Sequence, residues 1–268
     1  MRSRLFMQKN RSISIVSVFI LLSVGCKPLP VTKDESVVGG NEKYEAVSYY
    51  TFDSMNADDV SGYECHGYPV GEVKYTDDTP SGSGKALFLN GMLKQYVSIP
   101  HNVFAGNLSY SISFWIKDFT RGSIIAAVSS ELPRCDFPRL WAGESAFTFY
   151  TRYDNYDSTE SFVFKITPIL SPDWHHVVIT CENNGAILGN NALRCLYVDG
   201  KLVDKNQDYS QAYVSMHGWE EDIITSVHIG GDRNGYYSIA PSMKIDNIRF
   251  YLSAIPSYLV KELYESRK

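Results

Sequence analysis

The sequence contains few charged residues and no excess of basic ones. Asp, Glu, Lys and Arg make up 21% of its 268 residues, and 30 acidic residues outnumber 25 basic ones. This charge content is too low for a coiled coil or a disordered tail, whereas 44% hydrophobic residues is ordinary for a globular protein. Because nucleic-acid binding needs a clustered basic surface that neutralises phosphates, the composition argues against a nucleic-acid partner.

The apolar stretch near the start, Ile13 to Val24, is too short to span a bilayer as a mature helix. Before it stand four basic residues, Arg2, Arg4, Lys9 and Arg11, and it ends at Gly25-Cys26. This succession resembles a bacterial lipoprotein signal, in which cleavage precedes a cysteine that then receives lipid. We therefore predict a signal peptide over residues 1–25 and lipidation of Cys26. An ordinary cleaved signal with an incidental cysteine is the alternative.

The residues after the signal predict a tether and a location. Lys27 resembles the residue that sorts lipoproteins to the outer membrane, so we expect a lipid-anchored protein on the periplasmic or cell-surface face of that membrane. Residues 26–43 contain two Pro and two Gly and predict a flexible tether before a domain over 44–268. The first 25 residues hold four basic residues and no acidic one, so the processed chain has a net charge of −9.

Aromatic residues are abundant, and 19 Tyr with 13 Phe favour pleated β structure. Short segments that alternate between apolar and polar residues recur between turn signals, and no convincing long helical pattern interrupts them. The predicted strands are Ala46–Asp53, Ala86–Leu89, Tyr96–Ile99, Ser109–Lys117, Ser123–Val128, Phe147–Tyr153, Ser161–Thr167, Trp174–Cys181, Arg194–Val198, Val227–Gly230 and Lys244–Tyr251.

Three local patterns refine this prediction. Residues 111–117 place three apolar side chains on one face and Ser113, Trp115 and Lys117 on the other, which predicts an antiparallel strand covered on one face only. Asp199-Gly200 is a hairpin turn signal, and Pro256–Ser266 has a narrow apolar stripe typical of a short helix. We predict one all-β domain of two packed antiparallel sheets with a short C-terminal helix.

Cysteine is sparse: besides Cys26 the chain holds Cys65, Cys135, Cys181 and Cys195. No two of them have the CxxC spacing of a zinc site. Four cysteines allow three disulfide connectivities, and the sequence alone does not choose among them. Cys181 ends one predicted strand and Cys195 enters the next, so a disulfide across that hairpin is the bridge we expect.

Several strings together resemble a known family. They are Tyr50-Thr51-Phe52-Asp53, Ser111-Ile112-Ser113-Phe114-Trp115-Ile116-Lys117, Trp174-His175-His176-Val177-Val178, Leu196-Tyr197-Val198-Asp199-Gly200 and Lys244-Ile245-Asp246-Asn247-Ile248-Arg249-Phe250-Tyr251. Over residues 46–266, in this order, they resemble the laminin-G-like domains of the concanavalin A-like lectin/glucanase superfamily. The resemblance implies a jelly-roll sandwich of two sheets. It implies no single function, because this fold hosts lectins, glycosidases and adhesive modules.

The carboxylates expected of a glycosidase on this scaffold are missing. Such enzymes place acidic residues at positions i, i+2 and i+4 of one strand, so that their side chains share a face. Only Glu220 and Asp222 stand two residues apart, and the third position is Ile224. We predict no catalytic residue, and a divergent glycoside hydrolase that uses Glu220 or Asp222 is a less favoured alternative. His175 and His176 point to opposite faces of one strand and are predicted to be structural.

A structural calcium ion is implied by the resemblance, because related domains often pair their termini near an ion. Asp53 and Asp59 lie near the start of the domain and Asp246 lies on its closing strand, so these three are the predicted ligands. Calcium needs several carboxylate and carbonyl oxygens. A turn role for Asp59 and a backbone hydrogen bond for Asp246 are the alternatives.

Two segments combine aromatic rings, which lie well against the C–H faces of sugars, with polar groups for the hydroxyls. The predicted ligand-binding residues are Trp141, Tyr153, Tyr156, Trp219, Arg233 and Tyr236. The sequence thus favours a non-catalytic surface lipoprotein that binds a glycan on a concave aromatic face. The alternative is a protein-interaction or adhesion module with protein partners in a cell-surface assembly.

Overall fold

A computed structural model describes residues 44–91, 95–100, 103, 109–129, 139–143, 146–152, 159–165, 172–183, 192–208, 224–231 and 241–267. The predicted signal peptide, Cys26 and the predicted tether lie outside these residues. None of the described segments is a helix long and apolar enough to cross a membrane.

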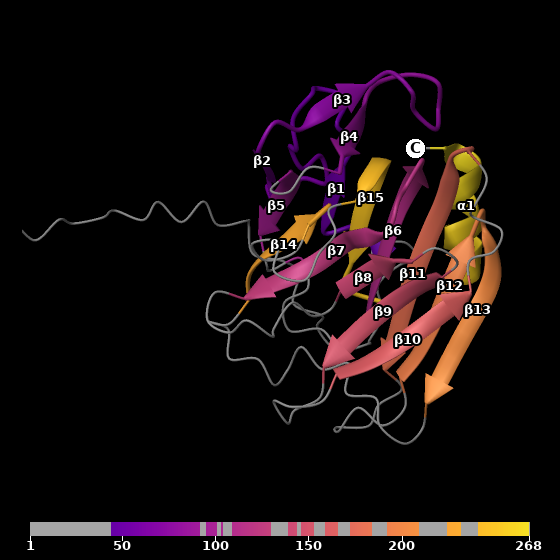
Figure 1. The fold of residues 1–268 in the computed structure, drawn as a ribbon. Coiled ribbons are helices and arrows are strands. Elements are labelled where there is room, and N and C mark those ends of the chain that lie inside the picture. Colours follow the sequence, from indigo (N-terminus) through magenta and orange to yellow (C-terminus); the bar gives the residue numbers. More distant parts are fainter. Residues whose placement is uncertain are drawn as a thin grey trace, which may run out of the picture.

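The described residues form two antiparallel sheets and one helix (Figure 1). The eight-stranded sheet has the order β13-β12-β11-β6-β15-β4-β3, with β1 paired to β15; the seven-stranded sheet has the order β10-β9-β8-β7-β14-β5-β2. The elements are β1 (Ser48–Tyr50), β2 (Tyr68–Val70), β3 (Lys74–Thr76), β4 (Ala86–Asn90), β5 (Tyr96–Pro100), β6 (Tyr110–Lys117), β7 (Gly122–Ser129), β8 (Arg139–Ala142), β9 (Ala146–Arg152), β10 (Thr159–Lys165), β11 (His175–Asn183), β12 (Ala192–Val198), β13 (Lys201–Asp208), β14 (Ile224–Ile229), β15 (Ser242–Tyr251) and α1 (Ser257–Ser266). This architecture confirms the predicted all-β jelly-roll sandwich with a C-terminal helix.

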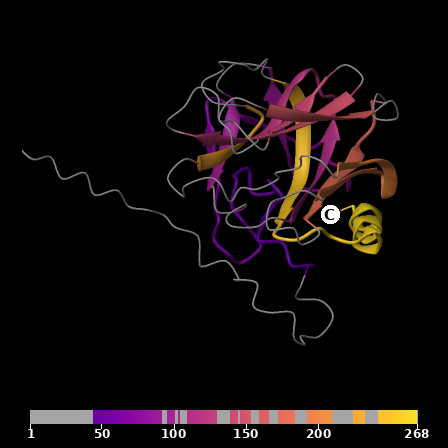
Figure 2. The same ribbon diagram turned by 90° about the horizontal axis from the view of Figure 1, so that it is seen from below.

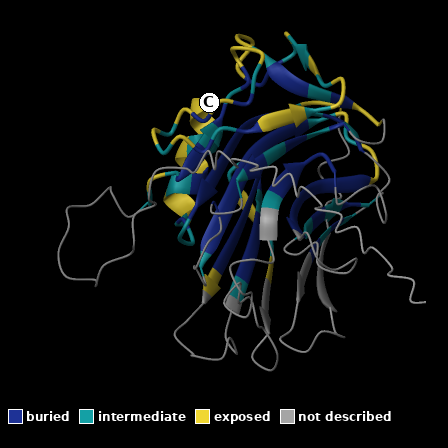
Figure 3. Ribbon diagram, turned by 90° about the vertical axis from the view of Figure 1, so that its left-hand side faces the viewer, coloured by how far each residue is buried: buried dark blue, intermediate teal, exposed yellow. Residues whose placement is uncertain are grey.

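The core lies between the two sheets, where the inward-facing residues of the central strands are buried (Figure 3). Phe114 and Phe250 enter it from the eight-stranded sheet, and Phe147 and Phe149 enter it from the seven-stranded sheet. Because strand side chains alternate, the intervening residues lie on the outer face of each sheet, away from this core. The outer faces are therefore where the strands present side chains to anything other than the opposite sheet.

Strand β6 corrects the prediction that only one of its faces would be covered. Ser113 and Trp115, on the outer face, are as buried as the core residues. The cover is α1, which lies over the outer side of the eight-stranded sheet (Figure 2), with Val260 packed among Val178, Tyr251 and Ile255. Alternation shows which residues share a face, but it does not show that a distant helix covers that face.

The segment that leads into α1 is fixed to β6 by one side chain. The hydroxyl of Ser111 donates to the carbonyl of Ser253 at 2.8 Å and accepts the backbone N–H of Ile255 at 2.9 Å. Pro256, whose ring fixes φ at −73°, then occupies the cap position before the first helical turn. The helix consequently docks at a defined place on the sheet.

The hairpin between β12 and β13 turns at Asp199-Gly200, as predicted. Both residues have positive φ, 51° and 73°, which is the geometry of the tight turn that suits twisted antiparallel strands. A side chain on Gly200 would lie 3.1 Å from the ring of Tyr264, so a glycine also allows α1 to approach the turn. The turn between β12 and β13 thus lies in contact with the helix.

Candidate functional site

Trp141 lies on the outer face of the seven-stranded sheet. In β8 its neighbours Leu140 and Ala142 enter the core, whereas Arg139 and Trp141 point to the opposite side and are half-buried. The guanidinium groups of Arg121 and Arg139 lie 5.9 Å and 5.6 Å from the centre of the indole ring. Both distances are within the range of cation–π attraction, which favours this placement of the ring beside two positive groups.

Polar groups flank this ring on both neighbouring strands. The register pairs Trp141 with Ser123 of β7 and with Thr148 of β9, so all three side chains share the outer face. The hydroxyl of Ser123 is buried and has no hydrogen-bond partner among the described residues. Trp141 therefore combines an apolar ring with hydroxyl and guanidinium groups, the mixture predicted for a sugar-binding surface.

A pair of stacked rings lies on the same outer face as Trp141. Tyr96 of β5 stacks on His228 of β14, with ring centres 4.1 Å apart and planes inclined by 22°. The pairing Arg139–Ala126–His228 connects this pair to the residues around Trp141 across β8, β7 and β14. We call Trp141, Arg121, Arg139, Tyr96 and His228 the Trp141 face.

Sequence reasoning identified Trp141 alone among these five residues. The alternation of Arg139-Leu140-Trp141-Ala142 is the signal by which Arg139 could have been found, because residues two apart on a strand share a face. The Tyr96–His228 stack joins strands far apart in sequence, and no local pattern indicates it. The other predicted ligand-binding residues, Tyr153, Tyr156, Trp219, Arg233 and Tyr236, lie outside the described residues, as do Glu220 and Asp222.

The two adjacent histidines have separate environments. The ring nitrogen Nδ1 of His175 lies 2.8 Å from the carboxylate of Asp199, whose other oxygen accepts the backbone N–H of His176 at 3.0 Å. His176 is fully buried, and its Nε2 lies 2.9 Å from the hydroxyl of Ser113. Burial, reinforced by the positive charge of Arg249, lowers the pKa of His176 to about 3, so the ring is neutral at pH 7. These contacts agree with a structural role.

Asp59 organises a turn. Its Oδ1 accepts the backbone N–H groups of Tyr49 and Ser61 at 2.8 and 2.9 Å. Its Oδ2 accepts the hydroxyl of Ser61 at 2.8 Å and the backbone N–H of Cys65 at 3.0 Å. Four donors saturate the two oxygens, so this predicted calcium ligand has no acceptor position left for an ion.

Asp53 and Asp246 are arranged differently. Asp246 is buried, and burial raises the pKa of its carboxyl to about 8, with the negative charge of Asp53 acting in the same direction. Oδ1 of Asp53 accepts the backbone N–H of Lys85 at 3.0 Å, and Gly84 allows this approach because a Cβ there would lie 1.9 Å from that oxygen. The described residues contain no group of three His, Cys, Asp or Glu side chains able to hold a metal ion.

The expected disulfide between Cys181 and Cys195 is wrong, since both cysteines are free and buried. The register of β11 with β12 pairs Cys181 with Arg194 and Thr180 with Cys195. The two cysteines are offset by one residue, so their side chains leave opposite faces of the sheet and a bridge cannot form. Cys65, by contrast, is disulfide-bonded, and its partner lies outside the described residues.

Comparison with known families identifies this architecture. Residues 90–257 match the family model of the concanavalin A-like lectin/glucanase superfamily, laminin-G type. The chain belongs to this superfamily. The predicted resemblance is therefore confirmed. No curated protein sequence matches the chain.

Solved structures of similar fold include binding domains. The receptor-binding domain of botulinum neurotoxin type G has a TM-score of 0.60 at 12% identity, over 83% of this chain and 51% of that one. A structure of botulinum neurotoxin type C, whose cell entry depends on interaction with two ganglioside molecules, gives 0.60 at 16% identity, over 84% of this chain and 51% of that one. Domain 4 of AbnA, a GH43 arabinanase from Geobacillus stearothermophilus in complex with arabinotriose, gives 0.54 at 16%, over 83% and 100%. The chain spans about half of the toxin domains, and the likeness establishes the fold alone.

Proposed function

We propose that this concanavalin A-like domain is a non-catalytic carbohydrate-binding module that binds a glycan on the Trp141 face. One observation carries the proposal: a half-buried tryptophan on an outer sheet face, flanked by Arg121 and Arg139 and by the hydroxyl of Thr148. The apolar C–H face of a sugar ring packs on an indole, and ring hydroxyls accept hydrogen bonds from guanidinium groups.

Similar domains support the ligand class. Domain 4 of AbnA was solved with arabinotriose, and the entry of a type C neurotoxin into cells depends on gangliosides. These two ligands differ in composition, but both contain sugar rings with free hydroxyl groups. A glycan partner is thus consistent with the geometry of the Trp141 face, and the identity of the sugar is to be found by experiment.

The sequence before the domain supports a surface location. We propose that the chain is cleaved before Cys26, lipidated there and held at the outer membrane by the tether of residues 26–43. The anchor would leave the domain free to reach extracellular or periplasmic polysaccharide.

We also propose that calcium binds at Asp53 and Asp246, whereas Asp59 shapes the turn beside them. A buried carboxyl with a second carboxylate nearby is unfavourable when ionised, and a divalent cation would neutralise both charges. When bound, the ion would supply electrostatic cross-linking of the first loop to the closing strand.

The decisive experiment is a glycan array with plant, host and microbial polysaccharides, followed by calorimetry on the glycans that bind. Trp141→Ala is expected to weaken binding by about tenfold or more, because an aromatic anchor at the centre of a site contributes most of its affinity. The matched control is Tyr258→Ala, which removes an exposed ring (55% exposed) from helix α1, on the side of the other sheet, and is expected to leave the affinity unchanged.

Other outcomes would favour the alternatives. An array without any bound glycan, together with a protein that co-purifies in constant proportion, would contradict the proposal and support an adhesion module. Release of reducing sugar that is lost in Glu220→Gln and Asp222→Asn variants would indicate a divergent glycoside hydrolase.

A further inference from the structure

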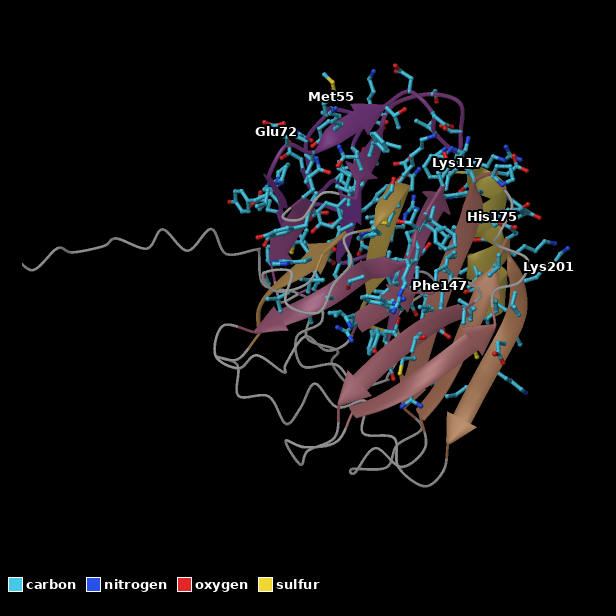
Figure 4. All side chains as sticks on the ribbon, in the orientation of Figure 1. Met55, Glu72, Lys117, Phe147, His175 and Lys201 are labelled. Atoms are coloured by element: carbon cyan, nitrogen blue, oxygen red, sulfur yellow. The ribbon has the colours of Figure 1, made fainter. Side chains whose placement is uncertain are left out.

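A cavity of about 630 Å³ opens on the outer face of the eight-stranded sheet, beside the C-terminal end of α1. Its lining comes from the β3–β4 loop, from β6, from the start of β11, from the β12–β13 turn and from the end of α1. Figure 4 places Lys117 and His175, two lining residues, near that end of the helix. The volume lies within the range of cavities that hold small ligands. No residue of the Trp141 face takes part in it.

Three aromatic rings form the walls. The rings of Trp115 and Tyr264 are stacked, with centres 5.8 Å apart and planes inclined by 21°. Trp174 immediately precedes β11, the neighbour of β6, and its indole N–H donates to the carboxylate of Asp78 at 2.9 Å. Because each ring is fixed by a neighbour, the apolar surfaces of the cavity exist before any ligand arrives.

One polar atom in these walls lacks a partner. The side chain of Trp115 is only 2% exposed, and its buried indole N–H has no hydrogen-bond acceptor among the described residues. A buried donor without an acceptor is unfavourable, and native structures satisfy nearly all of them. Trp115 lines the cavity, so a small rotation of its ring on ligand binding would let an acceptor on the bound molecule satisfy this covered N–H.

The charges around the cavity are balanced. Lys117 is paired with Asp78 at 2.9 Å, and Asp199 is paired with His175 at 2.8 Å. Of the remaining lining residues, Asp173 and Arg267 carry opposite charges. These balanced charges favour neither an anionic nor a cationic ligand. The carboxylates and basic groups instead suit a ligand with several hydroxyl groups, because each hydroxyl is both a donor and an acceptor.

We propose that this cavity is a second ligand site, which binds a neutral sugar residue between the aromatic walls. A ring or hydroxyl oxygen of the sugar accepts the indole N–H of Trp115, and its hydroxyls donate to the carboxylates of Asp173 and Asp199. The proposal rests on the cavity itself and stands whether or not the Trp141 face binds a glycan.

The wall formed by residues 79–82 is held in place by one carboxylate. Asp78, the residue before this loop segment, accepts hydrogen bonds from Lys117, Lys244 and Trp174 at 3.0, 2.6 and 2.9 Å. Burial acts to raise the pKa of Asp78, but these three donors outweigh it and lower the pKa to about 2. The carboxylate is therefore ionised throughout the neutral range, and the loop is fixed to both β6 and β15.

The test is heteronuclear NMR of the full chain with isotope-labelled tryptophan, in which each indole N–H gives one signal. Trp115→Phe, which keeps an aromatic ring and removes the N–H, assigns the signal of Trp115; Trp141→Ala assigns that of Trp141. The probes are neutral arabinose, glucose, xylose, mannose and galactose trisaccharides at about 10 mM, a concentration that reveals millimolar dissociation constants. At least one trisaccharide is expected to shift the Trp115 signal, in the wild type and in Trp141→Ala alike.

Affinity gives the second readout. Trp115→Phe loses one hydrogen bond to the trisaccharide and is expected to weaken its binding by about threefold to tenfold. The signal of the Trp174 indole N–H reports the binding in this variant. A Trp115 signal that none of the neutral trisaccharides moves would overturn the proposal, and so would unchanged affinity in a folded Trp115→Phe. Shifts confined to Trp141, and abolished by Trp141→Ala, would confirm the Trp141 face and reject this cavity, so the two proposals fail separately.

Discussion

Asp59 and Asp246 are both buried near the first strand, and their carboxyl groups differ in the number of donors that surround them. Four hydrogen bonds saturate Asp59, whereas the carboxyl of Asp246 accepts the backbone N–H of Asn247 at 2.7 Å. The sequence placed both residues in one predicted calcium site because each is an aspartate in the right region. Residue type alone does not indicate which carboxylate is already satisfied.

Calcium is therefore expected to act through Asp246. Adding Ca²⁺ at about 100-fold above its dissociation constant should raise the unfolding temperature of the wild type by roughly 5–10 °C. Asp246→Asn should abolish this rise, because an amide cannot neutralise the ion. Asp58→Asn, at an exposed acidic position close in sequence to Asp53, is the control and should retain it. Differential scanning calorimetry with Ca²⁺ or a chelator makes the measurement, and an identical rise in Asp246→Asn would contradict the assignment.

His176 is expected to make the domain sensitive to acid. Its pKa is about 3 in the folded chain, below its ordinary value of 6.5, so between these values the unfolded chain binds a proton that the folded chain does not. Stability should fall as pH drops through this window, by up to roughly 1.4 kcal/mol per pH unit. The groups that face His176 are Ser113 and Trp115 from β6, Asp199 from the β12–β13 turn, Arg249 from β15 and Tyr264 from α1.

Urea unfolding of the wild type and of His176→Gln at pH 6.5 and pH 4 measures this contribution. Carboxylates titrate in both proteins, so the difference between the two pH profiles isolates the histidine. Parallel profiles would show that His176 does not carry the expected linkage.

Strand β6 and helix α1 show how two elements far apart in sequence depend on each other. The outer face of β6 is buried only because Val260 and Tyr264 of the helix lie against the sheet. Val260→Ala should destabilise the domain by about 2 kcal/mol, since it leaves space in a closed cluster with Val178 and Tyr251. The same substitution at Val203, which is 37% exposed on β13, should change stability by less than about 0.5 kcal/mol. Equal effects in urea unfolding would mean that the helix contributes little.

Most strands could be predicted from the sequence, because period-two alternation and turn residues are local signals. β4, β5, β6 and β15 are found within two residues of their predicted bounds. The three-residue strands β2 and β3 were missed, since so short a segment shows no alternation. β8 was also missed, although its four residues alternate and its Trp141 was singled out.

Contacts between strands were harder to predict than the strands. The disulfide prediction failed by one residue of register, which the sequence on either side of residues 184–191 does not encode. The cavity beside the C-terminal end of α1 was missed because its walls come from five separate parts of the chain. The sequence shows which side chains lie along one strand. Which other element those side chains contact depends on the packing of the whole domain.

The whole molecule is expected to reside at a membrane through its lipid. Cys26→Ser should move the chain from the membrane fraction to the soluble fraction, because it removes the thiol that receives lipid. Cys195→Ser, which replaces a free cysteine within the domain, is the matched control and should leave the partition unchanged. Fractionation and mass spectrometry of the mature N-terminus decide the matter, and equal partition of both variants would favour an ordinary signal.

The two proposed sites lie on opposite outer faces of the sandwich, one on each sheet. Two recognition surfaces that point in opposite directions cannot both contact a single stretch of a stiff polysaccharide. Instead, one anchored molecule would join two separate strands, so the domain would act as a cross-link between glycan chains rather than as a longer grip on one of them. A dense field of such molecules would then retain polysaccharide at the cell surface as a network, even where each individual contact is weak.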